Sequence, residues 1–432
     1  MQYIRNWLFG NEKNIMRASS VWNLIYSVEY SLLSAALMLI VTRVSGTYAT
    51  GVFLIAYTVT QMMATIGSYG MRSFQVSDIK NEYSFSTYFA SRIVSVVAMV
   101  IICMGYSFIQ GYDAQRMIII VILCAYRLIE DVEDVFHAEM QKQMRLDVAS
   151  KIAALRIFIA AICFSIVFFV SKNLVLASLA LTISAGLVTI VLTSLVSNSF
   201  PEISLRTEWK AVPKLLFVCL PICVGGFLYN YLVNAPKYAI DRNLSEDTQT
   251  IFNILFMPIF AINMLSSFVF KPLIVKMGVL WNENKKGEFV ASILKQIVII
   301  IGITLVVIAG GVVIGLDILG WMYGVDLDGY RMLFAVLILF GGFAALVSFL
   351  VVILTIVRKQ TCIIVAYAIA MLIDLLLIDG LVIRYGIWGA GATYGMAMGV
   401  VLIILTVVLV ITILKRKDNH DRTIKEDISQ VV

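Results

Sequence analysis

Charged residues and histidines are scarce in this sequence. Asp, Glu, Lys and Arg make up 14% of its 432 residues, and only two histidines are present. A soluble globular domain carries roughly 25% charged residues, so this chain has too little polar surface to face water on all sides. The six cysteines lie in apolar runs and form no Cys-x-x-Cys pair. We therefore expect buried apolar cysteines and no metal centre.

Other signals are missing as well. The first residues are polar and basic and contain no small-residue cleavage site, so a cleavable signal peptide is not expected. No nucleotide-binding motif occurs, which argues against ATP and against any cofactor. The net charge is +6, but the basic residues are not clustered as a nucleic-acid footprint would be. No nucleic-acid partner is expected, and no soluble domain is large enough to be an enzyme.

Long apolar runs are what the sequence does contain. Apolar residues make up 61% of the chain, and about 20 of them in a helix cross a bilayer core of roughly 30 Å. The runs are continuously apolar rather than alternating, which excludes a barrel. The sequence therefore predicts an all-α membrane protein of about twelve transmembrane helices. The predicted spans are 21–43, 50–71, 88–110, 115–137, 149–170, 174–197, 211–234, 249–270, 290–314, 331–356, 361–383 and 388–414.

The basic residues orient these spans. Cytoplasmic loops of membrane proteins are enriched in Lys and Arg. With the N-terminus inside, the inside segments hold 24 of the 33 basic residues and the outside loops hold seven. The sequence therefore predicts that both termini are cytoplasmic.

A polar stretch divides the spans six and six, as in transporters built from repeated halves. At an offset of 199 residues, Arg43 aligns with Arg242 and Phe53 with Phe252. An even number of spans per half predicts two parallel lobes related by a pseudo-twofold axis along the membrane normal. The predicted parts are a cytoplasmic or interfacial N-terminus (1–20), an N-lobe (21–197), a cytoplasmic linker (198–210), a C-lobe (211–414) and a cytoplasmic tail (415–432).

The fourth span carries most of the charge inside the membrane. Five polar residues fall within a helical arc of about 120°: Arg127, Glu130, Asp131, Asp134 and His137. An ionisable group at this depth normally faces a cavity or a partner. We interpret Arg127 to Asp131 as lining a water-filled cavity, with an acid available for proton or cation coupling.

The rest of that span has a second interpretation. Glu133 lies off the arc, and a helix that ends early would leave Glu133 to Glu139 as an ordinary solvated face. We favour this interpretation for that stretch.

Further ionisable residues lie in other spans: Glu29, Arg156, Asp374 and Asp379. Each can act in transport or form a structural ion pair, and the sequence leaves both readings open. In the last span Gly391, Gly395 and Gly399 recur every four residues, which indicates a small-residue packing face.

Three stretches carry a resemblance to a known family. They are 42–74, with Arg43, Gly46 and Gly51; 126–151, the fourth span and its basic loop; and 230–258, with an Asn-x-Pro-Lys-Tyr motif ending the seventh span. Together with the twelve spans, they resemble the polysaccharide-transporter branch of the multidrug/oligosaccharidyl-lipid/polysaccharide exporter superfamily. One departure is that Ser245 and Thr250 replace the glycine pair in the second half.

The resemblance implies a flippase. Such proteins move undecaprenyl-pyrophosphate-linked oligosaccharides, the units of O-antigen or capsule, across a bacterial cytoplasmic membrane by alternating access. It implies that Arg43 and Lys237 face a central cavity. We expect a cationic substrate site of Arg43, Arg127, Arg156, Lys237 and Arg242.

Coupling to H⁺ or Na⁺ would use acids, for which the candidates are Glu29, Glu130, Asp131 and Asp374. The expected partners are the lipid-linked oligosaccharide, membrane lipid, a polysaccharide polymerase and glycosyltransferases. Two other functions are weighed. A multidrug cation antiporter of the same superfamily would rely on acids rather than cations. A membrane polysaccharide polymerase would need a long outside loop, whereas the longest here is about 235–248.

Overall fold

The computed structural model describes residues 2–10, 15–78, 81–197, 199–200, 203, 209–270 and 273–416. Within these residues every regular element is a helix, and ten helices are long and apolar enough to cross a membrane. The prediction of an all-α, multi-pass membrane protein is therefore confirmed.

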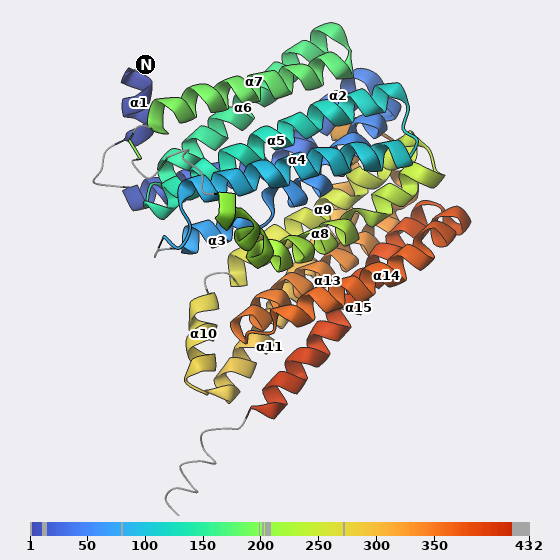
Figure 1. The fold of residues 1–432 in the computed structure, drawn as a ribbon. Helices are drawn as coiled ribbons and strands as arrows, with labels where there is room; N and C mark the ends of the chain where they lie inside the picture. The colour runs from blue at the N-terminus through green and yellow to red at the C-terminus, as the bar shows by residue number, and fades with distance from the viewer. Residues whose placement is uncertain are drawn as a thin grey trace, which may run out of the picture. The chain divides into compact units, whose positions relative to one another are not determined.

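The helices follow one another through two compact units, Met1–Asn230 and Tyr231–Val432, called here the N-terminal unit and the C-terminal unit (Figure 1). The boundary between the units falls within α8. The predicted linker 198–210 and tail 415–432 lie largely outside the described residues, so the predicted lobe limits stay a prediction. The helices are α1 (Gln2–Phe9), α2 (Ile15–Ser68), α3 (Met71–Ser77), α4 (Phe85–Ile109), α5 (Ala114–Lys142), α6 (Leu146–Ser171), α7 (Leu174–Ser197), α8 (Val212–Asn243), α9 (Glu246–Phe270), α10 (Ile274–Asn282), α11 (Lys286–Gly310), α12 (Leu316–Tyr323), α13 (Arg331–Ile356), α14 (Gln360–Tyr385) and α15 (Ile387–Lys415).

Two segments explain why ten apolar spans are found where twelve were predicted. The predicted spans 21–43 and 50–71 both lie in the continuous stretch Ile15–Val76, which counts as one. The predicted span 115–137 corresponds to α5, whose charged side chains keep it from counting as an apolar span. The twelve-helix layout and its orientation remain predictions.

Gly46 interrupts α2. The backbone angles of Gly46, φ 81° and ψ −178°, are not helical, whereas the segments before and after it are helices. That combination of angles is essentially restricted to glycine. The hydroxyl of Thr50 donates to the Gly46 carbonyl at 2.8 Å, one turn later. The break therefore separates the two halves of α2 at the point where the sequence predicted the end of one span and the start of the next.

We expect Gly46→Ala to destabilise the protein by about 1–3 kcal/mol, through backbone strain alone. A Cβ at this position would meet no atom within 4 Å, so no steric clash adds to the strain. Gly105→Ala is the matched control, because its Cβ also meets nothing but its backbone is helical. The thermal midpoint of purified protein should fall for Gly46→Ala and stay or rise for Gly105→Ala. Equal midpoints for the two variants would contradict the strain at Gly46.

The N-terminal unit is held together by five long helices, α2, α4, α5, α6 and α7, which run side by side (Figure 1). The most extensive contacts join α6 to α7 and α2 to α6. The second half of α2 is buried continuously from Thr50 to Thr60. Aromatic packing connects it to α6, where the rings of Phe53 and Phe164 lie 5.5 Å apart. This central position of α2 brings its tyrosines next to the charges of α5.

The C-terminal unit is built from α9, α11, α13, α14 and α15. Close packing of α13 on α15 uses part of the predicted glycine face of α15. A Cβ at Gly395 would lie 2.4 Å from the Phe340 ring of α13, and one at Gly391 would lie 3.1 Å from Leu333. Gly399 has open space instead. The small-residue face is thus confirmed for the first two glycines and wrong for the third.

Candidate functional site

The charged part of α5 is buried in the N-terminal unit. The helix begins at the cap Asp113, whose Oδ1 accepts from the backbone N–H of Arg116, and continues through an apolar run to the charges. Arg127 is 2% exposed and Asp131 is 6% exposed. Burying an ionisable group is costly, so most such groups in a membrane protein pair with one another.

The favoured interpretation of Glu133 to Glu139 as a solvated face is wrong. Glu133, His137 and Glu139 are all buried. The reason is that α6 and α7 cover this side of α5 and supply polar partners. Arg156 of α6 donates from Nε to Glu133 Oε2 at 2.7 Å, and the Thr189 hydroxyl of α7 lies 3.2 Å from Glu133 Oε1.

Two arginines and two glutamates form one connected set of ion pairs, called here the charge quartet: Arg127, Glu130, Glu133 and Arg156. Arg156 Nη1 donates to Glu130 Oε1 at 3.0 Å, and Arg127 Nη1 pairs with Glu130 Oε2. The formal charges of the quartet cancel. The sequence assigned Arg127 and Arg156 to the cationic substrate site and Glu130 to ion coupling, and the structure brings these three side chains into direct contact.

Tyrosines surround the arginines of the quartet. Arg156 Nη1 also donates to the Tyr126 hydroxyl at 3.0 Å. The Cζ atom of Arg127 lies 4.7 Å from the centre of the Tyr57 ring and 5.6 Å from that of Tyr126, within cation–π range. In the described part of the chain, Nη2 of Arg127 has no hydrogen-bond partner. Arg127 therefore keeps one donor edge for a further acceptor.

A second buried polar group lies where α2, α4 and α5 meet. Arg92, one of the 24 basic residues that the sequence assigned to inside segments, is fully buried. It donates to the Gly67 carbonyl at 2.9 Å and to Asp134 Oδ2 at 3.1 Å. Arg72 of α3 pairs with the other oxygen of Asp134. Arg92 thus supplies a hydrogen-bond donor to the Gly67 carbonyl, which lies in the last turn of α2 and has no partner within the helix.

Asp131 lies beside this second group. A Cβ on Gly67 would come within 2.1 Å of Asp131 Oδ2, so the carboxylate packs directly on the glycine backbone. Among the described residues, this oxygen has no hydrogen-bond partner. The acid is thus buried with unused acceptor capacity, unlike Glu130, whose two oxygens both accept from arginines.

In the C-terminal unit, Lys237 is a buried cation of a different kind. It is 6% exposed, and its ammonium lies 5.2 Å from the centre of the Phe256 ring and 5.8 Å from that of Phe260. Within the part of the chain that the structure describes, no carboxylate forms an ion pair with it. Lys237 follows Pro236 within α8, and its side chain faces the two phenylalanine rings of α9.

The other predicted residues of the C-terminal unit differ in setting. Arg242 is partly exposed and pairs with Asp379 at 2.8 Å. Asp374 is 4% exposed and accepts a hydrogen bond from Tyr231, while its Oδ2 has no partner among the described residues. Two predicted residues of this unit, Lys237 and Asp374, are therefore buried, and Arg242 is closer to the surface.

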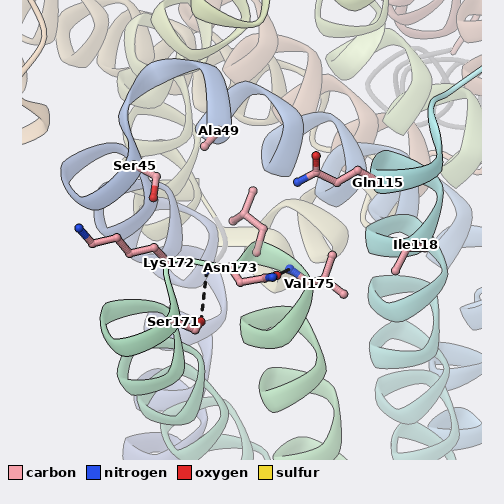
Figure 2. Close-up of a pocket in the computed structure, with 9 residues that line it drawn as sticks. Ser45, Ala49, Gln115, Ile118, Ser171, Lys172, Asn173 and Val175 are labelled. Carbon is pink, nitrogen blue, oxygen red and sulfur yellow. Dashed lines mark hydrogen bonds between the residues drawn. The ribbon is translucent and has the colours of Figure 1, made fainter.

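Arg43 and Glu29 lie on α2 in the N-terminal unit. Arg43 is exposed, and Glu29 is partly buried. Two residues beyond Arg43, an open hollow of about 530 Å³ begins at Ser45 and extends to Gln115 of α5 and the α6–α7 turn at Lys172 (Figure 2). Asn173 in that turn caps α7 by accepting from the backbone N–H of Val175. The side chains that line the hollow are mostly exposed, so it is a surface feature rather than a buried site.

No metal centre is found in the described ranges, since no three His, Cys, Asp or Glu residues gather there as ligands would. The residues that sequence reasoning missed are Glu133, Arg92, Tyr57 and Tyr126. Helical spacing placed Glu133 away from the predicted stripe, Arg92 was assigned to a cytoplasmic segment, and nothing in the sequence marked the two tyrosines. Only the neighbouring helices identify them.

This arrangement of helices is the fold of transporters of the MOP superfamily. The lipid II flippase MurJ in an inward closed conformation superposes with a TM-score of 0.70 at 12% sequence identity, covering 91% of this chain and 89% of that chain. An inward-facing multidrug resistance MATE family transporter of the MOP superfamily matches with a TM-score of 0.67 at 13% identity, over 90% of this chain and 96% of the other.

A further MOP superfamily transporter, from Pyrococcus furiosus, matches with a TM-score of 0.59 at 12% identity, over 95% of this chain and 97% of its own. No protein-family model and no curated protein sequence matches the chain. At these identities the likeness defines the fold. The similar proteins are transporters and flippases, which are not enzymes.

Proposed function

We propose that this protein is a flippase that moves undecaprenyl-pyrophosphate-linked oligosaccharides from the cytoplasmic to the outer leaflet of a bacterial cytoplasmic membrane. The single observation that carries this proposal is Lys237, a buried ammonium whose neighbours are aromatic rings and to which no described carboxylate is paired. A buried charge without a counter-ion is costly to maintain. A group of this kind is expected where an anionic ligand supplies the missing charge.

The chemistry of a pyrophosphate suits the cations of both units. Arginine binds phosphate oxygens through paired, charge-assisted hydrogen bonds. Arg127 has an unused Nη2, so a phosphate oxygen can bind there without breaking the quartet. In the proposal Arg43 and Arg242 act at the outer ends of their helices, and Arg127, Arg156 and Lys237 act deeper. Arg156 has a supporting part, because its donors already serve Glu130, Glu133 and Tyr126.

The direction of transport follows from charge. A pyrophosphate diester carries two negative charges, and each charge that crosses the full membrane field gains about 2.3 kcal/mol per 100 mV. An inside-negative potential therefore favours outward movement. The polyprenyl chain would stay in lipid, and the proposed twelve-helix, two-lobe arrangement with both termini inside would alternate access to the headgroup site. A polymerase and glycosyltransferases would be its partners in polymer assembly.

Ion coupling is a separate part of the proposal. Of the four candidate acids, Asp131 and Asp374 are buried and each has an oxygen without a described partner. Glu130 is held by two arginines and is the weakest candidate. Glu29 is partly buried, with one oxygen without a described partner. We therefore propose Asp131 and Asp374 as the first acids to test for H⁺ or Na⁺ coupling.

A multidrug cation antiporter is the second candidate function. The same two carboxyl groups favour it, because a buried acid with an unused oxygen also suits a cationic drug. One of the similar folds reported above belongs to a multidrug resistance MATE family transporter. The two functions require substrates of opposite charge, so one experiment separates them.

The test is a reconstituted transport assay with the full chain in vesicles. One set of vesicles contains a fluorescent undecaprenyl-pyrophosphate-linked oligosaccharide, and its exposure on the outer surface is followed with a membrane-impermeant quencher. A matched set contains a lipophilic cationic dye. The flippase proposal expects movement of the lipid-linked sugar only, and faster with an imposed membrane potential. Movement of the dye alone would establish the antiporter and end the flippase proposal.

A further inference from the structure

Helix α1 is attached to the N-terminal unit by its C-terminal end. Leu8 is fully buried in a core that includes Met140 of α5, Ile152 of α6 and Leu192 of α7. The Phe9 ring stacks on Phe200 with ring centres 6.2 Å apart. An eight-residue helix is not stable by itself in water, so these contacts are what hold it in place.

The end of α1 is capped by two cations of α6 and the turn before it. The last carbonyls of a helix have no partner inside the helix. Lys151 Nζ donates to the carbonyls of Trp7 and Leu8 at 3.1 and 2.9 Å, and Arg145 donates to the carbonyl of Phe9 at 2.6 Å. Cations at a helix C-terminus also interact favourably with its dipole. The capping gives α1 a defined orientation on the unit.

One side of α1 is apolar and exposed. Tyr3 is 89% exposed, Ile4 46% and Trp7 45%, and at 100° per residue the three side chains lie within one arc of about 100°. The Trp7 ring meets the Trp22 ring of α2 edge-on at 5.5 Å. Next to Trp22, Val21 is exposed as well. The three side chains of α1 are called here the α1 face.

The charged residues of 2–10 and 15–28, the described segments that include α1 and the start of α2, are basic. Arg5 and Arg17 are exposed, and residues 2–10 and 15–28, which the structure describes, contain no acidic side chain. Arg5 donates one hydrogen bond to Ser199 from Nη2, and no hydrogen bond is found from its other N–H groups to a described residue. Trp and Tyr with Arg on a short amphipathic helix is the composition of a segment that lies in the membrane interface.

We propose that the α1 face inserts into the interface of the bilayer beside the start of α2 and binds anionic lipid there, with Arg5 and Arg17 on headgroup phosphates. The apolar side chains supply the insertion, and the cations supply the preference for anionic lipid. The contacts of Leu8 with α5, α6 and α7, and the hydrogen bonds from Lys151 and Arg145, connect the lipid-binding helix to the rest of the N-terminal unit. The inference depends on membrane insertion of the chain but not on its substrate.

The test measures the depth of α1 in the full protein. Cys163 and Cys362, the two cysteines that are not buried, are replaced by alanine, and a single cysteine is placed by Ile4→Cys or, as the matched control, by Asn6→Cys on the opposite side of α1. Both positions are exposed, so the fold should be kept. An environment-sensitive fluorophore is attached, and the protein is reconstituted in phosphatidylcholine with or without phosphatidylglycerol.

Quenching by lipids that carry a spin label should be severalfold stronger at position 4 than at position 6, and stronger again with phosphatidylglycerol. Arg5→Gln with Arg17→Gln should remove the effect of phosphatidylglycerol and leave the difference between positions. Equal quenching at both positions would overturn the proposal, and so would indifference to phosphatidylglycerol. Shielding of position 4 from both lipid and aqueous quenchers would mean that a second protein copy covers the face, which also overturns it.

Discussion

Arg156→Leu is expected to destabilise the protein by about 3–5 kcal/mol, because removing one partner of a buried ion pair leaves an uncompensated charge. Arg156 is 2% exposed, and Glu133, its closest partner, is 2% exposed as well. Without the guanidinium, Glu133 keeps only the Thr189 hydroxyl and the more distant His137, whose Nε2 lies 3.7 Å away. Glu130 keeps Arg127 and is less affected.

The double variant Arg156→Leu with Glu133→Leu is the matched control. Removing both members of a buried pair is often close to neutral, since neither charge is then left alone. The free energy of unfolding, measured by titration of the purified protein with a denaturing detergent, should be lowest for the single variant and should recover in the double variant. A double variant as unstable as the single one would show that packing, rather than charge, holds α5 and α6 together here.

Lys237→Ala is expected to lower the rate of flipping by about 30-fold or more, since losing one partner of a buried, hydrogen-bonded charge pair costs about 2 kcal/mol or more. In the proposal that pair forms between Lys237 and the substrate. Stability should not fall, because the substitution removes a buried cation that has no described carboxylate partner. This combination of lost transport and kept fold distinguishes Lys237 from Arg127, which is part of the quartet.

Lys359→Ala is the matched control for charge, because Lys359 is exposed and its loss changes the net charge equally. Transport should be unchanged in this variant. Lys237→Arg should keep part of the activity, since it keeps the charge but not the compact ammonium. Flipping by Lys237→Ala at the wild-type rate, with the protein folded, would remove the main support for an anionic substrate.

Much of the fold could be predicted because apolar runs of spanning length are a property of the chain alone. The break at Gly46 lies between two predicted spans, where the sequence placed a glycine that accepts a backbone conformation closed to other residues. The glycine face of α15 was also predicted from spacing. Gly399 did not follow, because spacing cannot show where the neighbouring helix α13 ends its contact.

The site was harder to predict, because helical periodicity describes one helix at a time. The arc on α5 included Arg127 and Glu130 but left out Glu133, whose partner lies on α6. Arg92 was counted by its place near a loop, yet it is buried against the end of α2. Charges in this unit are paired between helices, and such pairing cannot be seen from the spacing of residues along one of them.

The sequence by itself determined that this is an all-helical membrane protein, because too few charged side chains are present for the chain to face water and only helices satisfy the backbone of continuous apolar segments in lipid. Only the tertiary structure decided which buried charges are neutralised. It paired Arg156 with two glutamates of α5 and left Lys237 beside phenylalanine rings. The physical reason is that the cost of a buried charge depends on the distance to its counter-ion, and that distance is set by helix packing.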